Sequence, residues 1–467
     1  MTLDAYLASL NGKKIAVLGI GVSNTPLIRL LCRAGLDVTA RDKTAREKFD
    51  AGRLEELESL GAGLILGEDY LDGLTGSDVI FRTPGLRPDL PQIAAARAAG
   101  AELTSEMEVF FKVCPATMIA VTGSDGKTTT TTIIAGLLEA AGKRVYVGGN
   151  IGTPLLDRVG EMKPKDFAVL ELSSFQLMTM KKSPHIAVVT NLAPNHLDIH
   201  KSMEEYVDAK RNILRFQTAS DRVVLNLDNE ITRGFAKDTP GQVIWFSRER
   251  QPERGVYLGR GTEDENAVWV KTGQDKHLVL PQRDILLPGI HNVENYMAAI
   301  AAVGELVPAE VIQSYAKTFG GVEHRIELVR ELDGVRYYND SIASSPSRTM
   351  AGLRSFKEKV ILIAGGYDKH IPYDVLGPDL VDHVKCMYLT GDTAPKIRAA
   401  AENAPGYSPG NPEIVDCADL QAAVDAAHRA AKPGDVVIMS PASASFDRYK
   451  NFMERGKVFK EMVNQLT

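Results

Sequence analysis

The sequence contains few features of secreted, membrane-bound or nucleic-acid-binding proteins. Its four cysteines form no Cys-x-x-Cys pair and no metal-ligand spacing, which fits a reducing compartment; they are Cys32, Cys114, Cys386 and Cys417. No uninterrupted apolar run approaches membrane length, and the N-terminus does not open with the basic region of a signal peptide. The net charge of −6 lacks the Lys/Arg excess on which broad binding to nucleic acids or acidic membranes depends. We therefore expect a cytoplasmic protein that neither binds nucleic acid nor inserts into a membrane.

The composition is that of an ordinary globular protein with several domains. Of the 467 residues, 44% are hydrophobic, which is enough for cores that need no disulfides. Short apolar runs ending in glycine- or serine-rich turns alternate with helix-like stretches, a pattern that predicts parallel sheets. We expect an α/β protein of three domains: a Rossmann-like domain (residues 1–105), a P-loop ATPase-type domain (106–321) and a second Rossmann-like domain (322–467).

The segment Val121–Thr129 (VTGSDGKTT) carries the strongest chemical signal. It follows a short apolar run and precedes a helix-like stretch, so a glycine turn is expected between a strand and a helix N-terminus. There, backbone N–H groups and the helix dipole point at one anion, Lys127 adds a charge and the Thr128 hydroxyl can hold Mg²⁺. This predicts a nucleoside triphosphate site. The first glycine of the usual pattern is replaced by Val121, and a chance Gly-Lys-Thr loop is the alternative.

Polar side chains follow two later strands of the same domain. Glu171 ends the apolar run 167–172, where a carboxylate after a phosphate loop commonly anchors Mg²⁺, although it could also cap the next turn. His196 and Asp198 follow the apolar run 186–192. A lone histidine is more often structural, but the carboxyl ends of parallel strands meet at one sheet edge, which favours a functional His196.

The first domain begins with a dinucleotide-type turn. Residues 19–24 (GIGVSN) follow the strand 14–18, and Asp42 stands about twenty positions later, as expected for contact with a ribose. The third glycine of that motif is replaced by Asn24, so NAD, FAD, a UDP-sugar and a purely structural turn all remain open. A second glycine turn, at Gly85, follows the strand 77–81, and two such loops at one sheet edge form a crevice.

Strands are also expected at 335–338, 359–364, 386–391 and 436–439, each ending in a turn. Residues 206–214 are typical of an amphipathic helix, and this pattern alone predicts that Lys210 is a solvated surface residue.

Taken in order, several segments resemble the Mur ligases: TGSDGKTTT, GGNIG, LELSSFQL, NLAPNHLD, the Tyr206-to-Lys210 helix, GIHNVEN and SPASASFD. These segments run from residue 122 to residue 447. The resemblance implies an ATP- and Mg²⁺-dependent enzyme of peptidoglycan precursor synthesis, acting as a cytoplasmic monomer. It would join UDP-N-acetylmuramoyl-L-alanine to D-glutamate through an acyl phosphate.

The resemblance also implies residue roles. Catalysis would rest on Lys127, Glu171, His196 and Lys210. ATP would be held by Gly123, Asp125, Gly126, Lys127, Thr128, Thr129, Asn292, Asn295, Arg325 and Asp340. The UDP-sugar would contact Val22, Ser23, Asp42, Gly85 and Asn150, and D-glutamate would contact Ser344, Lys369, Ser445 and Tyr449. Mg²⁺ would be bound by Thr128, Glu171, His196 and a carbamylated Lys210.

One position departs from the family pattern. The familiar Asn-Asp-Ser-Lys-Ala-Thr run reads NDSIAS at residues 339–344, so Ile342 replaces a lysine. Two alternatives stay open: another ligase of this superfamily with a different amino acid or substrate, and an NAD-dependent oxidoreductase built on residues 19–24.

Overall fold

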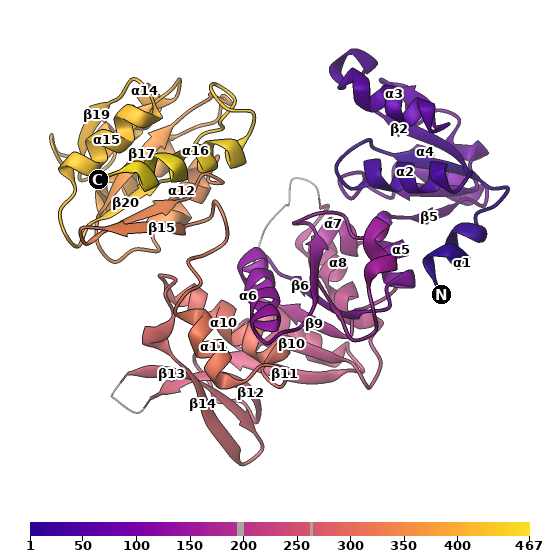
Figure 1. The fold of residues 1–467 in the computed structure, drawn as a ribbon, viewed down its shortest axis with the longest axis horizontal. Helices are drawn as coiled ribbons and strands as arrows, with labels where there is room; N and C mark the ends of the chain where they lie inside the picture. The colour runs from indigo at the N-terminus through magenta and orange to yellow at the C-terminus, as the bar shows by residue number, and fades with distance from the viewer. Residues whose placement is uncertain (194–199, 262–264) are drawn as a thin grey trace. The chain divides into compact units, whose positions relative to one another are not determined.

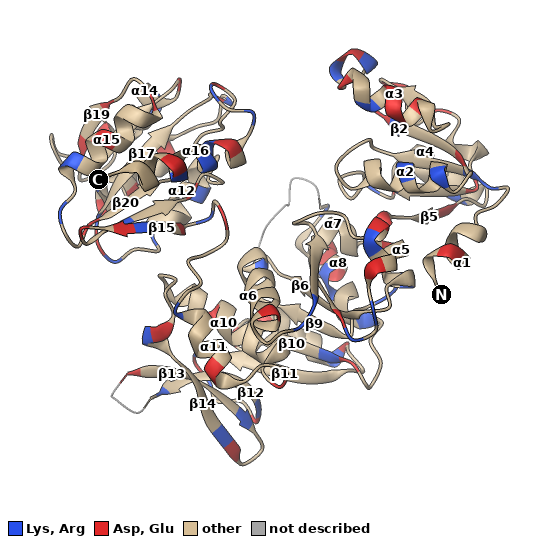
Figure 2. Ribbon diagram, in the orientation of Figure 1, with Lys and Arg blue, Asp and Glu red and all other residues tan. Residues whose placement is uncertain are grey.

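The computed structural model describes residues 1–193, 200–261 and 265–467 and contains three β-sheets flanked by helices (Figure 1). The chain divides into two compact units. Unit 1 comprises Met1–Asp284 and Val293–Tyr315, and unit 2 comprises Ile285–Asn292 and Ala316–Thr467. Lys/Arg and Asp/Glu residues are interspersed along the ribbon of both units (Figure 2). In the part of the chain described, no helix has the length and apolar character needed to cross a bilayer.

The first sheet of unit 1 is parallel, with strand order β3-β2-β1-β4-β5. Its strands are β1 (Lys14–Leu18), β2 (Asp37–Asp42), β3 (Gly63–Leu66), β4 (Val79–Arg82) and β5 (Glu102–Thr104). The helices of this segment are α1 (Leu3–Ala8), α2 (Asn24–Arg33), α3 (Ala51–Ser59) and α4 (Pro91–Ala98). Because the strand order reverses direction at β1, the loops after β1 and β4 flank a switch point, where ligands of open parallel sheets bind.

The second sheet, also in unit 1, has nine strands in the order β14-β13-β12-β11-β10-β9-β6-β8-β7. The strands are β6 (Thr117–Thr122), β7 (Val145–Gly149), β8 (Phe167–Glu171), β9 (Ile186–Val189), β10 (Arg222–Asn226), β11 (Gln242–Ser247), β12 (Arg254–Arg260), β13 (Asn266–Thr272) and β14 (Asp275–Pro281). The helices are α5 (Glu106–Val113), α6 (Lys127–Ala140), α7 (Ser174–Leu177), α8 (Met203–Arg215), α9 (Glu230–Gly234), α10 (Ile290–Val303) and α11 (Ala309–Ala316). The pairs β12–β13 and β13–β14 are antiparallel, and the other pairs are parallel.

The third sheet forms the centre of unit 2, with strand order β15-β16-β20-β17-β18-β19. Its strands are β15 (Glu327–Leu332), β16 (Val335–Asn339), β17 (Val360–Gly365), β18 (Val384–Thr390), β19 (Glu413–Asp416) and β20 (Val436–Met439). The helices are α12 (Pro346–Leu353), α13 (Gly377–His383), α14 (Ala394–Glu402), α15 (Leu420–Ala430) and α16 (Phe452–Gln465). Only the edge pair β15–β16 is antiparallel among the pairs of this sheet.

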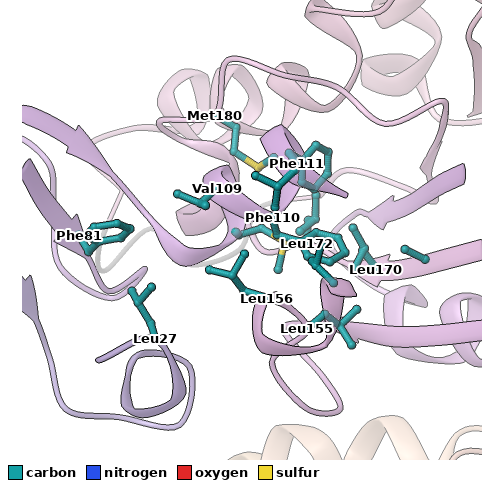
Figure 3. Packing of buried hydrophobic residues seen from close by; sticks show 14 of the residues in the cluster. Leu27, Phe81, Val109, Phe110, Phe111, Leu155, Leu156, Leu170, Leu172 and Met180 are labelled. Atoms are coloured by element: carbon teal, nitrogen blue, oxygen red, sulfur yellow. The ribbon is translucent and has the colours of Figure 1, made fainter. Parts of the chain in front are cut away.

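The main hydrophobic core of unit 1 contains residues of both its sheets and of α5. Figure 3 shows Phe110 and Phe111 of this helix near Leu170 and Leu172, and all four side chains are buried. Ser105 caps α5 by accepting from the Glu108 N–H, which fixes where the helix begins. Each fully buried phenylalanine or leucine stabilises the fold by roughly 1.5–3 kcal/mol, so this packing holds α5 against the second sheet.

The strands expected from the sequence are present, with ends displaced by one to three residues in several cases. The antiparallel strands β12–β14 were not predicted. The prediction from amphipathicity that Lys210 is a solvated surface residue is wrong, because the side chain is 2% exposed.

Candidate functional site

The turn between β6 and α6 has the geometry of an anion-binding loop. Gly126 is the N-cap of α6 in a left-handed conformation (φ 75°) and offers no side chain to occupy the first-turn N–H groups. A Cβ at Gly126 would collide with the Asn295 side chain, and one at Gly123 would collide with the Thr190 hydroxyl. Both glycines are therefore required, and the helix N-terminus stays open to an anion.

Lys127, the first residue of α6, folds back over this turn. Its ammonium donates to the carbonyl oxygens of Gly123 at 3.1 Å and Ser124 at 2.9 Å. These two carbonyl contacts hold the ammonium beside the loop. The cation and the helix N-terminus therefore both favour an anion at this turn.

The Glu171 carboxylate joins three segments of the second sheet. β8 pairs with β6 so that Glu171 lies opposite Val121, one strand from the glycine turn. One carboxylate oxygen accepts from the Thr128 hydroxyl at 2.6 Å, and the other accepts from the Asn150 side-chain amide at 2.8 Å. A buried carboxylate beside a threonine hydroxyl is a pair of hard oxygen donors, the type that Mg²⁺ prefers.

Lys210 reaches the same turn from α8. Its Nζ donates to the Thr122 hydroxyl at 3.0 Å and to the Gly123 carbonyl at 2.9 Å, and it lies 5.0 Å from the centre of the Tyr206 ring. Burial, reinforced by the nearby Lys127 ammonium, lowers the pKa of Lys210 well below its usual value. A neutral amine is a nucleophile, which the ammonium form is not.

The remaining proposed metal ligand, His196, lies outside the described residues, as does Asp198. Within the described ranges, no group of three or more His, Cys, Asp or Glu side chains is arranged to hold a metal ion. His200, which the sequence analysis did not single out, is buried against this region: its Nε2 lies 2.9 Å from the Ser174 hydroxyl and its ring stacks on Phe175.

The predicted UDP-sugar residues of the first sheet lie at the carboxyl ends of its strands: Val22, Ser23 and Gly85 are in the loops after β1 and β4, and Asp42 is the last residue of β2. Val22 and Ser23 are at the start of α2, where Val22 is 79% exposed. The Asp42 carboxylate accepts backbone N–H groups of Ile20 at 2.7 Å and Thr44 at 2.8 Å. Asp42 therefore shapes the turn after β1, whatever ligand it contacts. Gly85 is exposed in the loop after β4.

Arg82, which sequence reasoning missed, connects this loop to helix α7. Its guanidinium is fully buried and donates to the carbonyl oxygens of Thr83, Pro84 and Leu86. It also donates to the Phe175 carbonyl oxygen at 3.0 Å. A buried arginine at the end of a strand has no sequence pattern that distinguishes it from a surface arginine.

The residues predicted to bind the nucleotide beyond the phosphate loop are divided between the units. Asn295, in unit 1, accepts from the Thr130 hydroxyl at 3.2 Å beneath the start of α6. In unit 2, Asn292 donates to the Pro288 carbonyl at 2.6 Å. Asp340 accepts from the Ser440 hydroxyl at 2.7 Å, and burial raises the pKa of its carboxyl to about 7. Arg325 lies in the turn before β15.

The predicted D-glutamate residues lie in loops that follow three neighbouring strands, β16, β20 and β17. Ser344 follows β16, Ser445 and Tyr449 follow β20, and Lys369 follows β17. The last two loops are joined by a bridge between Tyr367 and Ala444, and the Lys369 ammonium lies 6.0 Å from the Phe446 ring centre. The topology thus gathers these loops at one sheet edge, with hydroxyls and a cation suited to a dicarboxylate.

Arg455 of α16, also missed from the sequence, holds two of these loops together. Its buried guanidinium donates to the hydroxyl and the carbonyl of Ser341 and to the carbonyls of Ser443 and Ala444. Burial lowers the pKa of Arg455 to about 10. The side chain fixes the loop after β16 relative to the loop after β20.

Comparison with known proteins gives consistent results over nearly the whole chain. Residues 121–303 match the Mur ligase middle domain, and residues 324–443 match the Mur ligase glutamate ligase domain. The UDP-N-acetylmuramoylalanine--D-glutamate ligases of Acetivibrio thermocellus and Ruminiclostridium cellulolyticum are 55% and 51% identical, each over 99% of this chain and 99% of the relative.

Among solved structures, the UDP-N-acetylmuramate-alanine ligase of Thermotoga maritima shares the fold, with a TM-score of 0.58 at 20% identity over 97% of this chain and 99% of that one. The two family domains account for the second and third sheets, and the relatives extend the match through the first. The chain therefore belongs to the Mur ligase family.

Proposed function

We propose that this protein is an ATP-dependent ligase that joins UDP-N-acetylmuramoyl-L-alanine to D-glutamate in peptidoglycan precursor synthesis. The observation that carries the proposal is the full-length identity of 55% and 51% to relatives that bear this ligase name. The phosphate-type turn at Gly123–Lys127, with Glu171 and Lys210 beside it, supports the ATP-dependent part. The Mur ligase glutamate ligase domain at residues 324–443 supports the amino-acid part.

The reaction follows from the poor electrophilicity of a carboxylate. The substrate carboxylate attacks the γ-phosphorus of ATP, which gives an acyl phosphate and ADP. The D-glutamate amine then attacks the acyl carbon, loses a proton and expels inorganic phosphate, so an amide forms. No protein nucleophile is required. The protein positions two anions against each other, and Lys127 offsets the phosphate charge.

The residues beside the phosphate loop fit a magnesium ion. Thr128 and Glu171 supply hard oxygen donors already within 2.6 Å of each other, and His196 is the further ligand proposed from the family. When bound, Mg²⁺ would neutralise phosphate charge and orient the oxygens of the nucleotide.

Lys210 fits this metal site only as an anion. A lysine ammonium would repel the metal, whereas a carbamate formed with CO₂ presents two oxygens to it. Its low pKa favours the amine form that reacts with CO₂.

The loops of the first sheet are the proposed UDP-sugar site, with Val22, Ser23, Asp42 and Gly85 from that sheet and Asn150 from the second. The loops of unit 2 are the proposed D-glutamate site, with Ser344, Lys369, Ser445 and Tyr449. Asn292, Asn295, Arg325 and Asp340 are the proposed contacts to the rest of the nucleotide. We further propose that the enzyme is a cytoplasmic monomer.

A phosphate-release assay on the purified protein tests the proposed function. Phosphate should appear only when ATP, UDP-N-acetylmuramoyl-L-alanine and D-glutamate are all present. The controls replace D-glutamate by L-alanine, L-glutamate or a diamino acid, and replace the nucleotide-sugar by UDP-N-acetylmuramic acid. Equal release with a control amino acid or a control sugar would reassign the protein to another ligase of the family.

A further inference from the structure

Ile342 leaves the loop after β16 without the cation that the family pattern places there. The residue stands in the run NDSIAS at 339–344, where the resemblance to the Mur ligases implies a lysine. Its backbone is fixed from two sides: the Ile342 N–H donates to the His324 carbonyl at 3.1 Å, and its carbonyl accepts from the Ser344 N–H at 2.8 Å. The position is thus well defined, but its side chain is apolar.

Arg348 brings a cation to the backbone of this same position. It lies in the first turn of α12, and its Nη1 donates to the Ile342 carbonyl oxygen at 3.0 Å. The guanidinium therefore lies over the loop that carries Ser344, one of the proposed D-glutamate ligands. A single carbonyl occupies one of the five N–H groups of a guanidinium, so most of the fork remains available to a ligand.

A second arginine, Arg325, follows His324, the residue whose carbonyl oxygen accepts from the Ile342 N–H, so Arg325 and the Arg348 guanidinium approach the same position of the loop. Repulsion from Arg325, in addition to burial as the larger cause, lowers the pKa of Arg348. The turn that presents Arg325 is strained, because His324 (φ 65°) and Ile326 (φ 44°) both adopt the left-handed conformation, which a β-branched isoleucine strongly disfavours. Backbone strain of this kind concentrates at ligand-binding sites.

The two arginines have little negative charge to balance them. In the described ranges neither forms an ion pair within 4.0 Å. The carboxyl group that acts on Arg348 is that of Asp340, which is buried and accepts from the Ser440 hydroxyl and the Ile326 N–H. A strained turn and a carbonyl contact hold the two cations near each other. An anion that lies between them would stabilise this arrangement.

We propose that Arg348 supplies, from α12, the cation missing at position 342, and that Arg348 and Arg325 together bind an oxyanion of the reaction. The inference rests on the proposed function. The oxyanion is a carboxylate of the incoming amino acid or a phosphate group of the nucleotide, since planar guanidinium groups bind both in a bidentate manner.

Steady-state kinetics on three variants test this assignment. Arg348→Met should raise the KM for either D-glutamate or ATP by about ten- to a hundredfold, the range expected for losing a charge-assisted hydrogen bond. Arg348→Lys should raise this KM less, because lysine keeps the positive charge but lacks the planar guanidinium group. The double variant Arg348→Met/Ile342→Lys should recover much of the loss, because it returns a cation to the position used by the family.

The exposed Arg429, in the last turn of α15, provides the matched control, and Arg429→Met should leave both KM values unchanged. A rise in the KM for D-glutamate identifies the carboxylate, and a rise in the KM for ATP identifies the phosphate. Unchanged KM values in Arg348→Met, or a double variant no better than the single one, would overturn the assignment. If the wild-type protein releases no phosphate with D-glutamate, the proposed function itself fails, which separates the two cases.

Discussion

At the scale of single residues, one lysine is buried and, among the described residues, hydrogen-bonds to no carboxylate. Lys210 is 2% exposed and contacts a hydroxyl and a carbonyl oxygen. Its charged form is therefore poorly solvated, and its pKa is lowered well below the usual value. Such an environment disfavours the ammonium and favours either the neutral amine or a modified form of it.

Substitution of this lysine by arginine tests the proposed carbamate. Lys210→Arg keeps a positive charge, but guanidinium cannot form a carbamate, so phosphate release should fall by about 10²–10³-fold, the range seen on losing one charge-stabilising group. Stripping dissolved CO₂ from the wild-type assay should also lower the rate, and bicarbonate should restore it. Lys201→Arg, an exposed ion-paired position nearby, is the control. Near wild-type turnover in Lys210→Arg would rule out the carbamate.

Part of the residue-level picture could be predicted from the sequence. The nearness of Glu171 to the phosphate turn, seen in its hydrogen bond with Thr128, follows from parallel strands whose carboxyl ends meet at one edge, whereas Asn150 was indicated only by the family resemblance. The burial of Lys210 could not be predicted, because helical periodicity does not say how deeply a polar side chain is packed against a neighbouring sheet. Arg82, Arg348 and Arg455 were missed because their roles depend on carbonyl groups, which leave no pattern in a sequence.

At the scale of elements, the helix α5 contains a buried acid with an unsatisfied oxygen. Glu106 lies in the first turn of α5, and its Oε1 has no hydrogen-bond partner among the residues that the structure describes. Burial raises the pKa of Glu106 to about 7, so the folded protein keeps this proton under conditions in which the unfolded chain has lost it.

This proton predicts a pH dependence of stability. Between about pH 4.5 and pH 7 the unfolded state loses the Glu106 proton and the folded state keeps it, so the free energy of unfolding should fall as pH rises, by roughly 2–4 kcal/mol from this group. In Glu106→Gln, the fall in the free energy of unfolding between about pH 4.5 and pH 7 should be smaller by this amount, as measured from urea unfolding midpoints across this pH range. The exposed Glu55 of α3 offers the control Glu55→Gln. An unaltered slope in Glu106→Gln would show that Glu106 is ionised in the folded protein.

Elements differ in how well the sequence specifies them. Strands such as β1 and β20 are apolar runs bounded by turns, and the structure confirms their ends. The antiparallel strands β12–β14 include exposed faces and polar residues, as in Arg254–Arg260, so no continuous apolar run marks them. Their pairing depends on contacts between segments, which periodicity within one segment does not reveal.

At the scale of the whole molecule, each of the three sheets carries, in the loops after its parallel strands, most of the proposed contacts to a different ligand. The first sheet carries the UDP-sugar loops, the second the phosphate loop and the third the D-glutamate loops. This separation follows from the α/β architecture, in which each sheet has its own loop edge. A substitution in the loops of one sheet should therefore weaken the binding of one ligand more than that of the others.

Two substitutions in different sheets test this separation. Lys127→Ala removes the cation at the phosphate turn, so phosphate release should fall by about 10²–10³-fold, whereas the dissociation constant for UDP-N-acetylmuramoyl-L-alanine, measured by calorimetry, should stay close to wild type. Lys369→Met removes a cation from the third sheet, and the KM for D-glutamate should rise by about one to two orders of magnitude, with that for ATP changed far less. Each variant serves as the control for the other. Equal loss of nucleotide-sugar binding and phosphate release in Lys127→Ala, or an unchanged KM for D-glutamate in Lys369→Met, would contradict the assignment of one ligand to each sheet.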